Sequence, residues 1–188
     1  MALSTIDLSG KWQFKQYPTD ARRVEDLDLT DWYDADIPNS IFTNLIQGGQ
    51  LDETDLLTNP ENYEWVSKAP WIFRKNFHVD AETLDSDRID LLFEGLDTLA
   101  TIWVNNKLIS KIDNMFIPHK FDVTNLLQQG QNTVMVKFDS ALEYTLDKLS
   151  KSKIFKKPKF HQPHRIFMRK AQHQFGWDFC PALPGCAI

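Results

Sequence analysis

The fold is decided by residues 89–138, which read IDLLFEGLDTLATIWVNNKLISKIDNMFIPHKFDVTNLLQQGQNTVMVKF. Short runs rich in β-branched and aromatic residues alternate in this stretch with turn-forming residues. Runs at a spacing of roughly 8–12 residues, without helical patterns between them, are typical of antiparallel sandwiches. We therefore expect strands at 89–93, 99–104, 107–112, 116–121 and 133–138.

The dipeptide Asn105-Asn106 lies between two of these runs and predicts a β-hairpin. Asparagine tolerates the positive φ angles that a two-residue hairpin turn requires. Two further strands are expected at 10–14 and 71–79, where the residues alternate or are rich in aromatic side chains. Together these runs predict an all-β fold, an antiparallel jelly-roll β-sandwich.

Two short helices are expected at the periphery of this sandwich. Ser40 is a good N-cap for the apolar residues that follow it, and Gly48 and Gly49 end that helix. The second helix is expected over 140–150, because leucines recur there at i, i+4 and i+7. That spacing leaves one apolar stripe, so this helix should lie on the surface of the sandwich.

Length and composition indicate one ordinary globular domain over residues 1–188. The chain has a mass of 21.9 kDa, a net charge of -5 and 42% hydrophobic residues. A (β/α)₈ barrel needs about 250 residues, so chemistry that requires a barrel is expected outside this chain. The sequence contains no apolar run long enough to span a membrane and starts without a signal-peptide pattern, so we expect a cytoplasmic protein without a membrane partner.

The lysines between Lys148 and Lys159 form a basic run within an acidic chain. A basic segment is one feature of nucleic-acid binding, but no nucleic-acid motif accompanies this one. A solvated connection after the second helix is the preferred interpretation, and no nucleic-acid partner is expected.

Motifs for cofactors and metals were tested and set aside. The chain has no dinucleotide fingerprint, P-loop or zincin motif, so no cofactor is expected. His161, His164 and His173 could be imagined as metal ligands, but no acidic residue has suitable spacing and Pro163 interrupts the segment. No metal site is predicted.

The residues with the clearest chemical character lie at 169–179, which read RKAQHQFGWDF. An indole such as that of Trp177 can cover the apolar face of a sugar ring, and a carboxylate such as that of Asp178 accepts hydrogen bonds from neighbouring hydroxyls. Gly176 would allow an unusual backbone angle just before them. The alternative is a core tryptophan followed by a capping aspartate.

At this segment the sequence resembles the N-terminal sugar-binding domain of β-mannosidases, in the glycoside hydrolase family that includes β-galactosidases and β-glucuronidases. The resemblance is carried by 169–172 (RKAQ) and 175–178 (FGWD), and by further motifs in the family's order. These are 8–12 (LSGKW), 37–38 (IP), the stretch 48–61, 71–77, 93–98 (FEGLDT), the Asn105-Asn106 hairpin, 114–116 and 121–124. The match therefore covers nearly the whole chain.

The resemblance implies a galactose-binding-domain-like jelly roll that precedes an immunoglobulin-like domain and a catalytic (β/α)₈ barrel. Two glutamates on the barrel, about 5–5.5 Å apart, would hydrolyse the glycoside with retention, so no catalytic residue is assigned here. Trp177 and Asp178 would line the subsite for the terminal mannose, with Trp177 as a wall and Asp178 binding hydroxyls. Arg169 would orient Asp178 through a charge-assisted pair.

The expected function is that of the N-terminal domain of a β-mannosidase-like exo-glycosidase, which is not catalytic alone. Its partners would be a terminal mannoside or related sugar and the downstream domains of its own chain. A free-standing carbohydrate-binding module and a purely structural sandwich remain as alternatives. The chain departs from the family after Asp178, because Phe179 and Cys180 stand where the family usually has tryptophan and glycine.

Three other expectations concern single residues. Trp12, Trp71 and Trp103 lie within strand-like runs and are expected in the core. Glu94 and Asp97 flank a turn and are expected to cap it, with an acid/base pair as the alternative. Cys180 and Cys186 are not expected to form a disulfide framework or a zinc site.

Overall fold

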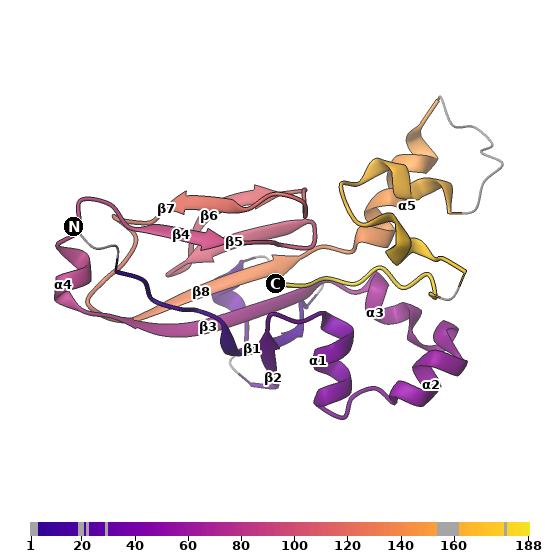
Figure 1. Ribbon diagram of the computed structural model, residues 1–188, viewed down its shortest axis with the longest axis horizontal. Helices are drawn as coiled ribbons and strands as arrows, with labels where there is room; N and C mark the ends of the chain where they lie inside the picture. The colour runs from indigo at the N-terminus through magenta and orange to yellow at the C-terminus, as the bar shows by residue number, and fades with distance from the viewer. Residues whose placement is uncertain (1–3, 19–20, 22, 29, 154–161, 179) are drawn as a thin grey trace.

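The computed structural model describes residues 4–18, 21, 23–28, 30–153, 162–178 and 180–188. Within these residues the strands form two antiparallel sheets, one with the order β2-β1-β3-β8-β5-β6 and one made of β4 and β7 (Figure 1). The strands are β1 Gly10–Gln16, β2 Tyr33–Ile37, β3 Trp71–Val79, β4 Asp90–Phe93, β5 Ala100–Val104, β6 Lys107–Ile112, β7 His119–Asp122 and β8 Gly130–Phe138. The predicted antiparallel β-sandwich is confirmed.

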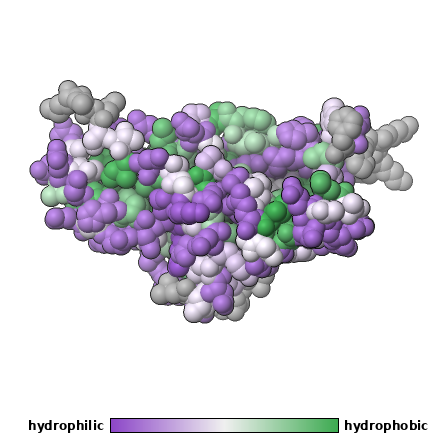
Figure 2. All heavy atoms as spheres, turned by 60° about the horizontal axis from the view of Figure 1, so that its bottom comes forward, coloured by the Kyte–Doolittle hydropathy of each residue, from purple (hydrophilic) through white to green (hydrophobic). Residues whose placement is uncertain are grey.

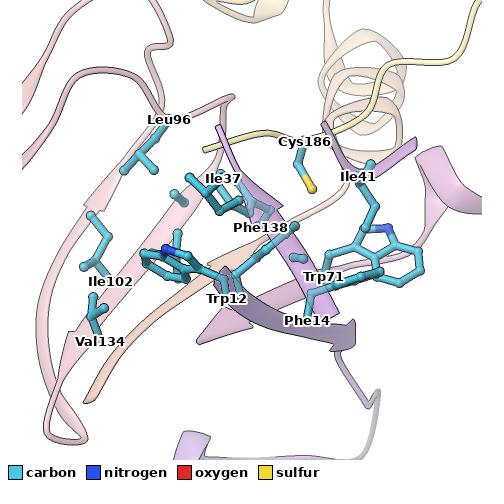
Figure 3. Close-up of a cluster of buried hydrophobic side chains, with 14 of the residues drawn as sticks. Trp12, Phe14, Ile37, Ile41, Trp71, Leu96, Ile102, Val134, Phe138 and Cys186 are labelled. Atoms are coloured by element: carbon cyan, nitrogen blue, oxygen red, sulfur yellow. The ribbon is translucent and has the colours of Figure 1, made fainter. Parts of the chain in front are cut away.

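The main core lies between the two sheets. Leu91 and Phe93 of β4 belong to the same buried cluster as Ile102 of β5 and Val134 of β8. Figure 3 shows this cluster where it meets the C-terminal segment, whose Cys186 directs its sulfur toward it. Burial raises the pKa of the Cys186 thiol, so it stays neutral and acts as an apolar core residue.

The predicted core tryptophans divide between two faces of the large sheet. Trp12 and Trp71 are buried in the main core, and each indole N–H donates to a backbone carbonyl, that of Leu8 at 2.6 Å and that of Val66 at 2.9 Å. Trp103 is half-buried and packs against a smaller cluster on the other face, because side chains alternate along a strand. The predicted core position is therefore confirmed for Trp12 and Trp71, whereas Trp103 packs outside the main core.

The predicted hairpin is confirmed. Asn105 and Asn106, with φ angles of 49° and 63°, join β5 to β6. The strand expected at 116–121 is shorter than predicted and begins only at His119. The Asn114 side chain accepts a hydrogen bond from the backbone N–H of Phe116 at 3.0 Å, and this turn leaves the Phe116 ring 63% exposed.

Both predicted helices are present, although one lies elsewhere than expected. The Ser40 hydroxyl caps α1 by accepting from the backbone N–H of Thr43 at 3.1 Å, and the Ser140 hydroxyl caps α5 in the same way. Helix α5 packs against η3 and α3 at one end of the sandwich, not on a sheet (Figure 1). The helices are α1 Ile41–Gln47, α2 Glu53–Thr58, α3 Glu64–Lys68, α4 Ala81–Leu84 and α5 Ala141–Lys151; the 3-10 helices are η1 Val24–Asp26, η2 Pro60–Tyr63, η3 Pro163–Phe167 and η4 Gln172–Phe175.

Among the described residues, no helix is long and apolar enough to cross a membrane. The face turned forward in Figure 2 shows hydrophobic side chains in separate patches between hydrophilic ones. His161, Phe179 and the lysines at 156, 157 and 159, all discussed above, lie outside the described residues.

Candidate functional site

The candidate site is a loop near the C-terminus that follows η4. Phe175, at the end of η4, is 1% exposed and lies edge-on to the ring of His164, with the ring centroids 5.5 Å apart. Gly176 follows with a φ of 105°, a backbone conformation that glycine adopts readily and other residues rarely. The chain then reverses, since the backbone groups of Trp177 and Cys180 exchange hydrogen bonds of 3.0 and 3.2 Å.

This turn presents Trp177 and Asp178 to solvent. The Trp177 side chain is 61% exposed, and Asp178 is also exposed. The alternative of a core tryptophan is therefore wrong. An exposed indole beside an exposed carboxylate provides one apolar face and one hydrogen-bond acceptor, the two features that a sugar ring needs from a protein surface.

Arg169 does not form the interaction that was expected of it. Its guanidinium donates to the carboxylate of Asp113, and both side chains are more than half exposed. The predicted orientation of Asp178 by Arg169 is thus replaced in the structure by an ion pair with Asp113. Both residues line a hollow of about 190 Å³ whose apolar wall comes from Leu99, Tyr144 and Met168.

A buried ion pair lies beneath the loop. The Lys170 side chain is 0% exposed, and its ammonium donates to Oδ1 of Asp97 at 2.6 Å and to the backbone carbonyl of Gly185 at 2.8 Å. The other carboxylate oxygen of Asp97 accepts from the side-chain amide of Gln174 at 2.9 Å. Burial lowers the pKa of the Lys170 ammonium, and the Asp97 carboxylate opposes that shift.

This ion pair was not predicted from the sequence. Asp97 was expected to cap a turn, yet its carboxylate binds two side chains that follow it by more than seventy positions. The only signal lay in the quoted motifs, since Asp97 belongs to the stretch 93–98 and Lys170 to the stretch 169–172. Glu94 lies near this site in sequence but is not part of the pair, so the acid/base alternative has no support among the described contacts.

The backbone of Asp97 also binds the C-terminal segment. The backbone N–H of Asp97 donates to the carbonyl of Ala187 at 2.9 Å, and the Ala187 N–H donates back at 3.1 Å. On its other side the segment is bonded to α1, because the Ile41 N–H donates to the carbonyl of Cys186 at 2.8 Å. The C-terminal segment therefore runs between the sheet and α1 (Figures 1 and 3).

Comparisons with known proteins identify the family of this chain. A family model described as "Glycosyl hydrolase 2 galactose-binding domain-like" matches residues 12–188. A β-mannosidase of Mus musculus is 31% identical over 161 residues, and a β-mannosidase B of Aspergillus flavus is 30% identical over 190 residues. These alignments cover 82% and 100% of this chain.

Among solved structures, the β-D-mannosidase from Dictyoglomus thermophilum matches with a TM-score of 0.85 and 32% identity over 97% of this chain. The chain spans 18–22% of these longer proteins. They therefore contain several times as much chain as is described above.

Proposed function

Since this chain belongs to the glycosyl hydrolase 2 galactose-binding domain-like family, we propose that it is the N-terminal domain of an exo-acting β-mannosidase and supplies the Trp177–Asp178 loop to the subsite for the terminal mannose. Hydrolysis of terminal β-mannosyl residues is assigned to the full-length protein. The domain alone is not catalytic in this proposal, and the cytoplasmic location stays a prediction.

The observation that carries the proposal is the exposure of Trp177 on a well-anchored turn. A tryptophan that is 61% exposed loses the free energy that burial of its large apolar surface would supply. Trp12 and Trp71 are buried in the main core, whereas the exposed position of Trp177 is explained if a ligand or a neighbouring domain covers the indole.

The chemistry of retaining glycosidases explains why the proposal assigns catalysis to the barrel and sugar binding to this domain. Such enzymes need two carboxyl groups about 5–5.5 Å apart, one as nucleophile and one as acid/base. In the proposal both belong to the downstream barrel, and Asp178 binds hydroxyls of the terminal sugar. Accepting hydrogen bonds from hydroxyls that tighten at the transition state is a contribution to catalysis without bond-making.

The test is the variant Asp178→Ala in the full-length protein, assayed on an aryl β-mannoside. We expect kcat/KM to fall at least tenfold, which corresponds to roughly 1.4 kcal/mol of transition-state stabilisation. Asp147→Ala on α5 is the matched control, because Asp147 is an exposed aspartate that forms a surface ion pair with Lys151 one helical turn away. Wild-type kinetics for Asp178→Ala would remove this residue from the site.

The carbohydrate-binding-module alternative makes a different prediction for the 188-residue chain. A module should bind methyl mannosides saturably on its own, whereas a domain that completes a barrel's subsite should give a flat calorimetric trace at millimolar sugar. Saturable binding that is lost in Trp177→Ala would favour the module.

A further inference from the structure

The loop that carries Trp177 and Asp178 is held at both of its ends by one buried ion pair, Lys170–Asp97. Before the loop, Asp97 binds the ammonium of Lys170 at 2.6 Å and the amide of Gln174 at 2.9 Å. After the loop, the Lys170 ammonium binds the carbonyl of Gly185 at 2.8 Å. The loop from 175 to 184 therefore leaves and returns to the same buried cluster.

The return point is also fixed by close packing. A Cβ atom added to Gly185 would lie 3.0 Å from Cγ2 of Ile41 and 3.1 Å from the ring of Phe42. The glycine therefore brings the backbone against α1, where the Lys170 ammonium can reach its carbonyl. A larger residue at this position would require Ile41 and Phe42 or the segment itself to shift.

Between these anchors, the turn has little support of its own. Among the described residues, Trp177 and Cys180 exchange two backbone hydrogen bonds, and both of these residues are exposed. The exposed turn itself therefore has few contacts, and its position depends on the hydrogen-bonded anchors and on the buried residues Phe175 and Pro184 that flank it. The ion pair has a geometric role that an apolar contact would not provide, because its hydrogen bonds have fixed directions.

We propose that Lys170 and Asp97 are positioning residues, which hold the Trp177–Asp178 turn in the geometry that meets the terminal sugar without touching the sugar themselves. This inference rests on the proposed function for its role in catalysis. The positioning itself is a property of this chain, and it is measured separately.

The first experiment measures the turn directly. The chain is labelled with 5-fluorotryptophan, which gives one ¹⁹F resonance for each of its six tryptophans, and Trp177→Phe assigns the resonance of interest. The double variant Lys170→Met/Asp97→Asn removes the ion pair without leaving one unpaired buried charge. We expect the Trp177 resonance to move or broaden, while the resonances of the buried Trp12 and Trp71 keep their positions.

The matched control is Lys151→Met/Asp147→Asn, which removes an exposed lysine–aspartate pair on α5. It should leave every resonance in place. If the double variant does not fold, Gln174→Met takes its place, because it breaks one anchor of the loop and leaves the ion pair intact. A folded variant whose Trp177 resonance is unchanged would overturn the proposal.

The second experiment asks whether the effect reaches catalysis through the turn. In the full-length protein, Lys170→Met/Asp97→Asn should lower kcat/KM on an aryl β-mannoside at least tenfold. Adding Asp178→Ala to that variant should cause no further loss, because residues that act through one group are not additive. Multiplicative losses would show that the pair acts on stability alone and would refute the positioning role.

The two experiments keep the two proposals apart. If Asp178→Ala has wild-type kinetics but the Trp177 resonance moves in the double variant, the proposed subsite fails and the positioning stands. If Asp178→Ala is impaired and the resonance does not move, the subsite stands and the positioning fails.

Discussion

The substitution Asp97→Asn should be among the most damaging single changes to this chain. It preserves the size and shape of the side chain and removes only its charge. Lys170 would then be an ammonium without any exposure, with the Gly185 carbonyl and an amide oxygen as its acceptors. Leaving one partner of a buried ion pair alone costs about 3–5 kcal/mol, a large part of the 5–15 kcal/mol that stabilises a typical domain.

Substitution of the other partner, Lys170→Met, should reduce the free energy of unfolding by less. In Lys170→Met the Asp97 carboxylate keeps the Gln174 amide and the Thr98 hydroxyl as donors, and its side chain is 10% exposed. It therefore retains hydrogen bonds and some contact with water, for which we expect a loss of about 1–3 kcal/mol. Asp97→Asn should therefore be more destabilising than Lys170→Met, because the two partners differ in burial and in the hydrogen bonds that they retain.

The pH dependence of the stability of Asp97→Asn provides a second test of this prediction. Burial already lowers the pKa of Lys170, and without the Asp97 carboxylate nothing in the pair opposes that shift. Between the folded pKa and the unfolded value of 10.5 the unfolded state binds more protons, so the stability of Asp97→Asn should rise with pH in that window. The alkaline gain should be larger than that of the wild type.

The assay is urea unfolding of wild type, Asp97→Asn, Lys170→Met and the double variant at neutral and alkaline pH. The double variant should be more stable than Asp97→Asn, because no charge is left alone in the interior. The reasoning is refuted if Asp97→Asn loses less than about 1 kcal/mol at neutral pH, or if Lys170→Met is the more damaging of the two.

Two further predictions concern the sandwich itself. Lys120 and then Arg88 lower the pKa of Asp90 below 3.8. The contribution of this carboxylate to stability is therefore present above pH 3.8 and is lost as the pH falls through its lower folded pKa, so the gap in unfolding midpoint between wild type and Asp90→Asn should close as the pH falls below 3.8. In the hairpin, Asn105→Gly should cost about 1–3 kcal/mol in denaturant unfolding because the Asn105 side chain makes three hydrogen bonds, whereas Asn106→Gly should change stability by no more than about 0.5 kcal/mol.

Much of the sheet was predictable from the sequence because its signals are local. The hairpin needs only two residues that tolerate positive φ between two β-prone runs, and Asn105 and Asn106 meet that condition. Strand β2, Tyr33–Ile37, was not predicted, since its sequence YDADI is rich in acid and short of β-formers. It is an edge strand that pairs only with β1 in the described sheet, where exposed charges are common.

The position of α5 could not be read from its own pattern. The spacing of its leucines defines an apolar stripe but not the partner that covers it. In the structure the helix packs against η3 and α3, and Leu146 of the stripe stays 40% exposed. Helix η3 belongs to the segment after residue 161, where no periodic pattern predicts this contact. The helix was thus predicted correctly as a surface element, while the elements that it packs against at one end of the sandwich were not predicted.

The candidate site also depends on contacts between distant segments, which local sequence patterns do not reveal. Trp177 and Asp178 could be selected from the sequence because they are neighbours and because their motif resembles a known one. Their presentation depends on Asp97, which lies in a turn after β4 and is brought to Lys170 only when the sheet and the C-terminal segment assemble. A lysine in a polar, basic segment is expected at the surface, so its burial is visible only in the folded chain. The loop's geometry is therefore a property of the assembled sandwich, and substitutions far from Trp177 in the sequence should alter it.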